Sequence, residues 1–384
     1  MNIGYIAPDG SNTLGDGTIG NPWKTPEYAL ANLAHDPQRI VRCHSGTYPP
    51  AFLTALHNGT PGYRTIIEAV TRRQAVFADA NGSQYHNFSI NNYTLTTNPE
   101  HWELRGLGST RAFSDGIKIG VHPDAGTGRA SDIVMMDCES HDNGGQGISG
   151  GPIDGILIDL CDVNYNGTSD LYNHGIYVTG DGVVVMRCRG YNNASHFVHI
   201  YTTTPGDVLN VLIALCRGVR TLPTAAARAY LVWTGQPEAY QTPVRIVGNT
   251  AAGGGWDSAV NIRRIDGAVI KNNAFAGAYS AATISESICE NTVRDYNCYD
   301  GLTGETNGVD AEPELDPDLL FPLLAGNCDG TGDAATIAAL LAELGLVVGD
   351  ADAMGNPMWG LPTVAPIGGL WRPLLDQRGA LRMQ

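Results

Sequence analysis

The chain has 384 residues, a length that fits either one long domain or two of ordinary size. Its formal net charge is −16 and its sequence pI is about 4.9, so it lacks the basic surface typical of a nucleic-acid binder. Only 16% of the residues are charged and 48 are glycine, a composition typical of a turn-dense all-β protein. No apolar run in the sequence is long enough to cross a membrane.

The first 50 residues predict a strand, a long loop, a helix and a second strand. The helix is expected to begin at Thr25 or Pro26, with Tyr28 and Leu33 on its apolar face. A short amphipathic helix in front of a repetitive fold is expected to cover the open end of its core. The start of the chain shows neither the basic nor the apolar segment of a signal peptide, so the chain as given is not expected to be a secretory precursor. We therefore expect an extracellular protein, secreted and processed, or a component of a virus particle.

A repeated pattern dominates the middle of the chain: a short apolar strand that ends in Cys or Asn. The copies occupy residues 133–138, 156–161, 183–188, 211–216, 244–249 and 268–273. Successive copies are 23, 27, 28, 33 and 24 residues apart. A period of this size is typical of a solenoid, and turns rich in Gly, Asn and Asp separate the strands without an intervening helix-length apolar pattern. The pattern predicts a parallel β-helix.

The last residue of each copy is expected to lie in one column inside the coil. The column consists of four cysteines and then two asparagines: Cys138, Cys161, Cys188, Cys216, Asn249 and Asn273. Buried thiols pack as small apolar groups, and stacked asparagine side chains can hydrogen-bond to one another. Within one copy, Val184, Met186 and Cys188 form one alternating set, against Val183, Val185 and Arg187, so that one set can face the core. We expect these cysteines to be structural, since no Cys–His cluster has zinc spacing.

Several short motifs near the start resemble the opening of right-handed parallel β-helix proteins of the pectate-lyase-like superfamily. They are Tyr5–Ser11, Gly17–Thr18, Asn21–Thr25, Ser45–Tyr48 and Gly59–Gly62. With the repeats, the resemblance covers roughly the first 300 residues. It implies an all-β fold: one right-handed parallel β-helix (solenoid) with an N-terminal helical cap and a C-terminal capping segment. It does not select a function, because that superfamily contains lyases, hydrolases, epimerases, phage tailspikes and non-catalytic surface proteins.

The composition changes after Gly301, where acidic residues and prolines become frequent. We divide the chain into an N-terminal cap with the first strands (1–63), the β-helix body (64–301) and a C-terminal cap or tail packed on the helix (302–384). Asp333 is a suitable N-cap for a helix over residues 334–344. The alternative for the last segment is an oligomerisation tail.

A second recurring strand follows the Asn- or Gly-rich turns, and it carries most of the titratable and aromatic residues. If Ile117, Ile148, Ile176, Val198 and Val260 point inward, the residue after each points outward. The outward column is then Lys118, Ser149, Tyr177, His199, Leu231 and Asn261. Asp115, Gln146, His174, His196 and Arg228 lie at the preceding turns, and Thr179, Tyr201, Trp233 and Arg263 lie two residues after the column. Adjacent coils bring such residues to about 5 Å from one another, so we expect the functional site on this face.

These residue types suit an acidic polysaccharide, because aromatic rings stack on sugar faces and cations neutralise uronate carboxylates. In β-elimination a base takes the C5 proton, an acid serves the leaving oxygen and a third group stabilises the carboxylate charge. Tyr177 paired with His199 or His174 is expected to supply the base and the acid, with Lys118, Arg228 and Arg263 as neutralising groups. The expected catalytic residues are Tyr177, His199, His174 and Lys118. The expected substrate-binding residues are His196, Tyr201, Arg228, Trp233, Asn261 and Arg263.

Metal and hydrolase chemistry have weaker support. His196 and His199 are expected to face opposite ways on a strand unless the turn rotates one of them, so we assign no metal ligand. The stretch from Asp162 to Gly167 matches the first half of a calcium loop, but Asn173 stands where the bidentate Glu is required. We therefore expect no cofactor, with Ca²⁺ as the open alternative. A hydrolase needs clustered carboxylates, and on this face the pattern places Asp115 alone.

The predicted function is a polysaccharide lyase-like enzyme that cleaves an acidic polysaccharide by β-elimination. The alternatives are a non-catalytic phage virion protein (a decoration, spike or tail component) and a glycan-binding surface protein. A polysaccharide is the expected partner, and neither nucleic acid nor a membrane is expected. A lyase needs an open cleft over Tyr177 and His199, whereas a structural spike would bury that face between subunits. Assembly as a homotrimer or within a virion is left open.

Overall fold

The computed structural model describes residues 2–310, apart from residues 35–36, 83–84, 92–96, 121–127, 169–171, 203–209, 223–225, 236–239, 242–243, 278, 301–304 and 306–307. The C-terminal cap expected over residues 302–384, with its helix at 334–344, therefore lies almost entirely outside the described residues.

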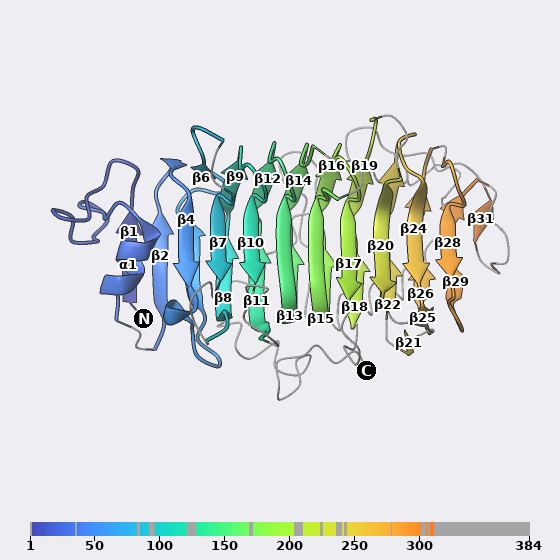
Figure 1. Ribbon diagram of the computed structural model, residues 1–384, viewed down its shortest axis with the longest axis horizontal. Coiled ribbons are helices and arrows are strands. Elements are labelled where there is room, and N and C mark those ends of the chain that lie inside the picture. Colours follow the sequence, from blue (N-terminus) through green and yellow to red (C-terminus); the bar gives the residue numbers. More distant parts are fainter. Residues whose placement is uncertain are drawn as a thin grey trace.

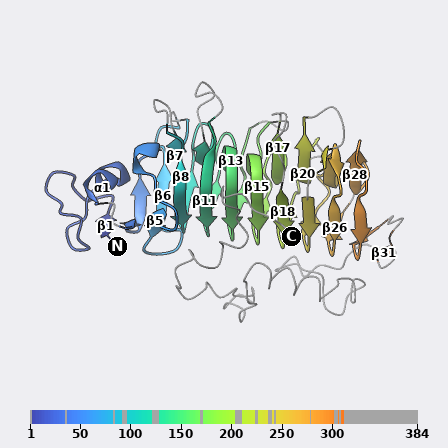
Figure 2. The same cartoon turned by 90° about the horizontal axis from the view of Figure 1, so that it is seen from below.

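The strands stack side by side into one elongated solenoid, a right-handed parallel β-helix as predicted (Figures 1 and 2). Successive coils pair in parallel. Each coil presents three faces, which are numbered 1 to 3 and whose strands are given below. The chain runs through them in the order face 2, face 3, face 1. The parallel stacking is continuous from β1 to β31.

Faces 1 and 2 belong to one 18-stranded sheet, because the long strands β13 (Ile148–Asp159) and β15 (Ile176–Met186) run through both. Face 1 contains the first halves of these two strands with β4 (Ala51–Thr54), β7 (Phe88–Asn91), β10 (Ile117–Gly120), β17 (Val198–Thr202), β20 (Arg228–Thr234), β24 (Ser258–Arg263) and β28 (Ile284–Ser287). Face 2 contains their second halves with β1 (Asn2–Ile6), β2 (Arg39–Cys43), β5 (Thr65–Ala69), β8 (Glu100–Arg105), β11 (Ala130–Met136), β18 (Val211–Ala214), β22 (Val244–Val247), β26 (Val269–Lys271) and β29 (Val293–Asp295).

Face 3 is a separate 11-stranded sheet of short strands. Its strands are β3 (Gly46–Tyr48), β6 (Ala75–Ala78), β9 (Leu107–Thr110), β12 (Glu139–His141), β14 (Asp162–Asn164), β16 (Arg189–Tyr191), β19 (Arg217–Val219), β23 (Thr250–Ala252), β27 (Ala274–Phe275), β30 (Cys298–Tyr299) and β31 (Val309–Asp310). The strands β21 (Tyr240–Gln241) and β25 (Ile265–Asp266) form a small additional pair.

The predicted N-terminal helix is confirmed as α1 (Pro26–Asn32), which lies at the blue end of the solenoid in Figure 1. The side chain of Thr25 accepts a hydrogen bond from the backbone N–H of Tyr28, and Pro26 occupies the first turn, where its missing N–H costs nothing. Ala29 and Leu30 are fully buried and belong to the main hydrophobic core.

The predicted column of cysteines and asparagines is confirmed inside the coil. Cys138, Cys161, Cys188 and Cys216 are free thiols with no exposed surface. The column continues through Asn249, Asn273 and Asn297, and the last of these was not expected from the sequence. The Nδ2 of Asn249 donates to the Oδ1 of Asn273 at 3.1 Å, and the Nδ2 of Asn273 donates to the Oδ1 of Asn297 at 2.9 Å.

The predicted alternation within a copy is wrong at its last step. Val183, Val185 and Cys188 share the main core, whereas Val184 and Met186 belong to a second apolar cluster on the other side of face 2. The cause is Arg187, which adopts a left-handed conformation with φ 51° and turns the next residue inward. The residue before each column position does the same in every copy: Asp137, Leu160, Arg187, Leu215, Gly248, Asn272 and Tyr296.

Replacing Asn273 by alanine is expected to destabilise the fold by about 1–3 kcal/mol, since buried partners lose their hydrogen bonds. These partners are the carbonyl of Ile246 and the side chains of Asn249 and Asn297. Asn32→Ala is the control, because the exposed Asn32 side chain, at the end of α1, donates to the backbone carbonyl of Tyr28 at 2.8 Å and lies outside the column. Urea unfolding followed by far-ultraviolet circular dichroism measures both changes, and equal midpoints for the two variants would contradict the structural role of the column.

Candidate functional site

Face 1 carries the outward column in the predicted register. Lys118 pairs with Ser149, Ser149 with Tyr177, and Tyr177 with His199. The column continues to Leu231 and Asn261 on the next two strands. The preceding apolar residues are buried in the core, as expected: Ile117, Ile148, Ile176, Val198 and Val260.

The second outward row is also in register and is largely aromatic. Thr179 on β15 pairs with Tyr201 on β17, Tyr201 with Trp233 on β20, and Trp233 with Arg263 on β24. The Tyr201 and Trp233 rings lie 4.9 Å apart, and the guanidinium of Arg263 lies 4.7 Å from the centre of the Trp233 ring. This row therefore offers stacking surfaces next to a cation.

The predicted site residues differ in how far they reach the surface. Lys118, Tyr177, His199, Tyr201, Arg228, Trp233 and Arg263 are partly exposed. His174, His196 and Asn261 are buried, with at most 8% of their surface exposed. The face is therefore a partly open surface with a buried polar layer beneath it.

Asp115, at the turn before β10, is the centre of a polar network that occupies Lys118. Its Oδ2 accepts hydrogen bonds from Ser149 Oγ at 2.8 Å and from Lys118 Nζ at 3.2 Å. Burial alone would raise the pKa of Asp115, but the charges of Lys118 and His86 and these hydrogen bonds outweigh it, so the pKa is lowered. Lys118 is therefore already paired with a carboxylate, which weakens it as a neutralising group for a substrate.

Arg228 and Arg263 differ in whether a carboxylate of the protein pairs with them. Nη2 of Arg228 pairs with Asp257 at 2.8 Å, so its charge is partly compensated. Within the described part of the chain, no carboxylate pairs with Arg263. Arg263 is the cation of this face that is best placed to meet an acidic ligand.

The rings of His196 and His199 lie together, so the exception holds in which the turn rotates one of them. Their ring centroids lie 5.1 Å apart, and both rings pack against His174. His196 belongs to the turn that enters β17. Strand alternation from Val198 would have placed its ring inward, but the turn brings the ring to the outward side. The structure thus joins the three histidines into one cluster.

The histidine cluster is neutral at physiological pH. Burial lowers the pKa of His174 to about 3, against the opposing charge of Asp115. Burial, followed by the neighbouring His174 ring, also lowers the pKa values of His196 and His199 well below their ordinary value.

This neutrality predicts a loss of stability in acid. Between about pH 6.5 and pH 3 the unfolded chain binds a proton at His174 that the folded chain does not bind, so stability falls as the pH falls through this window. The slope from one such group is at most about 1.4 kcal/mol per pH unit. His174→Asn is expected to show a shallower decline of the urea midpoint between pH 7 and pH 5 than the unmodified protein. His141→Asn, which removes a partly exposed histidine on β12, is the control, and equal slopes for the two variants would contradict the role of His174.

Tyr177 lies beside the cluster, with its ring 5.1 Å from that of His199 and 5.4 Å from that of His174. Burial and then the neighbouring Tyr201 raise the pKa of Tyr177. Among the described residues, no hydrogen-bond partner holds its hydroxyl. The hydroxyl is therefore available to a ligand and is protonated in the free protein at neutral pH.

Several buried polar atoms on the same stretch have no partner among the described residues. They come from β17, β20, β24 and their turns: Ser195 Oγ, His199 Nε2, Arg228 Nε, Trp233 Nε1, Ser258 Oγ and Asn261 Oδ1. Each such atom costs about 1–3 kcal/mol unless a water or a ligand satisfies it. Their concentration on one face indicates a binding surface, and Ser195 and Ser258 were not predicted from the sequence.

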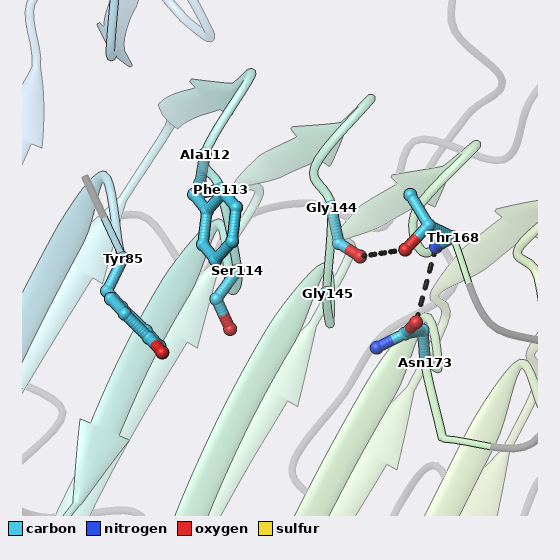
Figure 3. A pocket seen from close by; sticks show the side chains of 8 residues that line it. All are labelled: Tyr85, Ala112, Phe113, Ser114, Gly144, Gly145, Thr168 and Asn173. Carbon is cyan, nitrogen blue, oxygen red and sulfur yellow. Dashed lines mark hydrogen bonds between the residues drawn. The ribbon is translucent and has the colours of Figure 1, made fainter. Parts of the chain in front are cut away.

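A pocket of about 470 Å³ opens at the turn side of face 1 (Figure 3). The exposed rings of Tyr85 and Phe113 stand on one side, 5.5 Å apart, and Thr168 and Asn173 lie on the other. Ser114, also in its lining, bonds to Asp115 and links the pocket to the predicted site. Sequence reasoning missed this pocket because its aromatic residues lie in turns and follow no strand period.

Two side chains of the stretch that matches half a calcium loop have partners within the protein. Asp162 forms ion pairs with Arg73 and Arg189. Asn166 is buried in a second asparagine ladder, where its Nδ2 donates to Asn193 Oδ1 at 3.0 Å. These residues therefore serve the packing of the coils.

No family model matches the chain, and no curated protein matches its sequence. In the described part of the chain, no helix has the length and apolar character needed to cross a bilayer.

Solved structures do share the fold. Pectate lyase Pel9A superposes with a TM-score of 0.56 at 16% identity, over 86% of this chain and 87% of that one. A rhamnogalacturonan lyase superposes with a TM-score of 0.52 at 13% identity, over 93% and 95% of the two chains. An alginate lyase from Paenibacillus sp. str. FPU-7 gives a TM-score of 0.47 at 16% identity, over 69% and 95%. The chain therefore shares the right-handed parallel β-helix fold of pectate lyase Pel9A and the rhamnogalacturonan lyase.

Proposed function

We propose that this protein is a carbohydrate-active enzyme that cleaves an acidic polysaccharide by β-elimination on face 1. The observation that carries the proposal is the position of Tyr177 between the histidine cluster and the aromatic row that leads to Arg263. Among the described residues, its hydroxyl has no hydrogen-bond partner. Arg263 lies three strands from Tyr177, about 14 Å away at the usual strand spacing. One oligosaccharide can therefore contact both residues.

Tyr177 transfers the protons in this mechanism. Its ionised oxygen takes the C5 proton of a uronate residue, the bond from C4 to the leaving oxygen breaks and a C4–C5 double bond forms. The phenol then returns the proton to the leaving oxygen, so the enzyme ends in its starting state. The negative charge that develops on the carboxylate is stabilised by the polar groups of the face.

The raised pKa of Tyr177 gives this mechanism a defined pH dependence. Since only the ionised hydroxyl accepts the C5 proton, kcat/KM is expected to rise about tenfold per pH unit as the pH increases toward that pKa. The measurement is the initial rate between pH 7 and pH 10. A rate that stays level over this range would contradict Tyr177 as the base.

The proposal is tested with a panel of polysaccharides: alginate, pectate and glycosaminoglycans. Elimination creates an unsaturated uronate, which absorbs ultraviolet light, so product appears as a rise in absorbance. A rise with at least one substrate supports the proposal. A flat trace with all of them, at both pH 7 and pH 9, would reject it.

The alternative is a glycan-binding or virion protein without turnover. The observation that favours it is the burial of His174, His196 and Asn261 together with the pairing of Lys118 to Asp115. These features leave Tyr177 as the main reactive group on the surface. Glycan binding without any product would establish this alternative.

A further inference from the structure

Three histidine rings lie together where the turns enter β15 and β17. The rings of His174 and His196 are stacked, with centroids 4.6 Å apart and an interplanar angle of 6°. His199 stands at 84° to His174, with centroids 4.7 Å apart. One ligating nitrogen of each ring lies within 4.8 Å of the others. Such a cluster can bind a metal ion or can act as a group of hydrogen-bond donors.

The hydrogen bonds of the rings assign their protons. The backbone N–H of Arg228 donates to Nδ1 of His196 at 2.9 Å, and the backbone N–H of His196 donates to Nδ1 of His174 at 3.3 Å. A ring nitrogen that accepts carries no proton, so the neutral His174 and His196 rings are protonated at Nε2. Nε2 of His174 lies 3.1 Å from Nδ1 of His199. Because His174 donates in this contact, His199 accepts at Nδ1 and carries its own proton on Nε2.

This proton assignment does not fit a metal ion. A metal requires a lone pair on each ligating nitrogen, and in neutral imidazole only one nitrogen has it. In this cluster the lone pair of every ring already accepts a hydrogen bond, two of them from backbone N–H groups that cannot move away. Metal binding through the three rings would break these bonds.

We infer that the cluster is a preorganised donor site for the carboxylate of a uronate residue, with the Nε2–H of His199 as the donor and His174 as the positioning residue. His196 supports His174 by ring stacking and through its backbone N–H. This inference rests on the proposed uronate substrate. It also separates the roles on the face, because His199 stabilises the carboxylate whereas Tyr177 moves the protons.

The surroundings of His199 suit a bound anion. Its Nε2 has no hydrogen-bond partner among the described residues and is shielded from water. A buried donor without a hydrogen bond destabilises the free protein, and a carboxylate oxygen that accepts from it removes this penalty on binding. The partly exposed rings of Tyr177 and Tyr201 flank the His199 ring, with ring centroids 5.1 and 5.9 Å from its own. Because Nε2 is buried, a ligand reaches it only when a neighbouring side chain moves. Arg228, whose Nε also has no hydrogen-bond partner in the described part of the chain, adds positive charge nearby.

A neutral donor has an advantage over a protonated histidine. Its hydrogen bond does not depend on a proton taken up from solvent, so its strength is constant across the pH range in which Tyr177 becomes ionised. A protonated imidazole would lose its charge as the pH rises above about 6.5, before the phenol ionises. The two groups can therefore act together only if the histidine is a neutral donor.

The first test reads the protons directly and needs no activity. Histidine ring nitrogens are labelled with nitrogen-15, and long-range proton–nitrogen correlation spectra are recorded between pH 5 and pH 8. Loss of signals in His174→Gln, His196→Gln and His199→Gln assigns the three rings. We expect all three to be neutral, protonated at Nε2 and unchanged over this range. Protonation of His199 at Nδ1, or its titration near pH 6.5, would overturn the inference.

The same sample tests the metal interpretation. Zinc chloride alone is added to the protein in equimolar amount. We expect the three histidine spectra to stay unchanged. Stoichiometric binding that shifts all three rings would show that they are metal ligands and would overturn the donor assignment.

The second test uses the geometry of amide side chains. The Nε2 of glutamine reaches close to the position of the histidine Nε2, whereas the shorter asparagine does not. His199→Gln is expected to bind an oligogalacturonate or an oligomannuronate within about tenfold of the unmodified protein, and His199→Asn to lose about a hundredfold. His141→Gln, on face 3, is the control and should bind normally.

The same oligosaccharides, after reduction of their carboxyl groups to alcohols, test whether His199 recognises the carboxylate of the ligand. The difference between His199→Gln and His199→Asn should disappear with these neutral probes. Equal losses for both variants with the acidic probes would overturn the inference. The expected tautomers and carboxylate-dependent binding could both be found without any elimination product. That result would reject the proposed lyase reaction and would still support the donor site.

Discussion

Replacing Tyr177 by phenylalanine is expected to lower kcat/KM for elimination by about 10²–10⁴-fold, because the variant keeps the ring and loses the group that moves both protons. The hydroxyl makes no hydrogen bond to the described residues, so its removal leaves the packing of face 1 unchanged. Substrate binding should change little, since the aromatic row and Arg263 remain. Initial rates from ultraviolet absorbance, with binding measured by calorimetry, separate the two effects.

Tyr165→Phe is the matched control for this prediction. Tyr165 is about half exposed at 53% and packs against Tyr191 beside face 3, away from the predicted site. This variant should keep full activity. An unchanged rate in Tyr177→Phe, or an equal loss in both variants, would show that Tyr177 does not carry the reaction.

Replacing Arg187 by alanine is expected to destabilise the protein by about 3–5 kcal/mol, because it leaves a buried carboxylate without its partner. Nε of Arg187 donates to Oδ1 of Asp159 at 2.7 Å, and Nη2 bonds to the second carboxylate oxygen. The exposed fractions of the two side chains are 5% and 3%, so solvent screens this pair weakly. Burial already raises the pKa of Asp159 despite Arg187. Urea unfolding measures the change.

Arg42→Ala is the control for Arg187→Ala. Arg42 pairs with Glu68 at 2.7 Å on the same face of the solenoid, but 37% of its side chain is exposed. An exposed pair of this kind contributes about 0–1 kcal/mol. Similar losses of stability in the two variants would contradict the importance of burial.

The repeats alone predicted the β-helix and the register of face 1. Copies of similar length must stack in parallel, and the period of two along a strand then decides which residues leave the core. For this reason the column from Lys118 through Tyr177 and His199 to Asn261 lies where the pattern placed it.

The errors arose where the backbone leaves the regular strand. The left-handed residue at Arg187 breaks the alternation that was expected to carry Met186 inward with Cys188. The turn before β17 likewise brings His196 to the same side as His199. Strand periodicity cannot describe such residues, because their direction depends on local dihedral angles.

The ion-pair partners of the charged side chains were equally invisible in the sequence. The pairing of Lys118 with Asp115 and the ion pairs of Asp162 with Arg73 and Arg189 join residues 3 to 89 positions apart. Residue type alone suggested a neutralising lysine and a calcium ligand. The structure shows instead that both side chains have partners within the protein.

A crystal structure of the Tyr177→Phe variant soaked with an acidic oligosaccharide tests the central claim most directly. The expected result is a sugar chain along face 1, stacked on Tyr201 or Trp233, with carboxylate oxygens about 2.7–3.2 Å from His199 Nε2 and from the guanidinium of Arg263. A sugar chain bound elsewhere, or a second protein chain packed over Tyr177 and His199, would contradict the assignment of this face as the site of elimination.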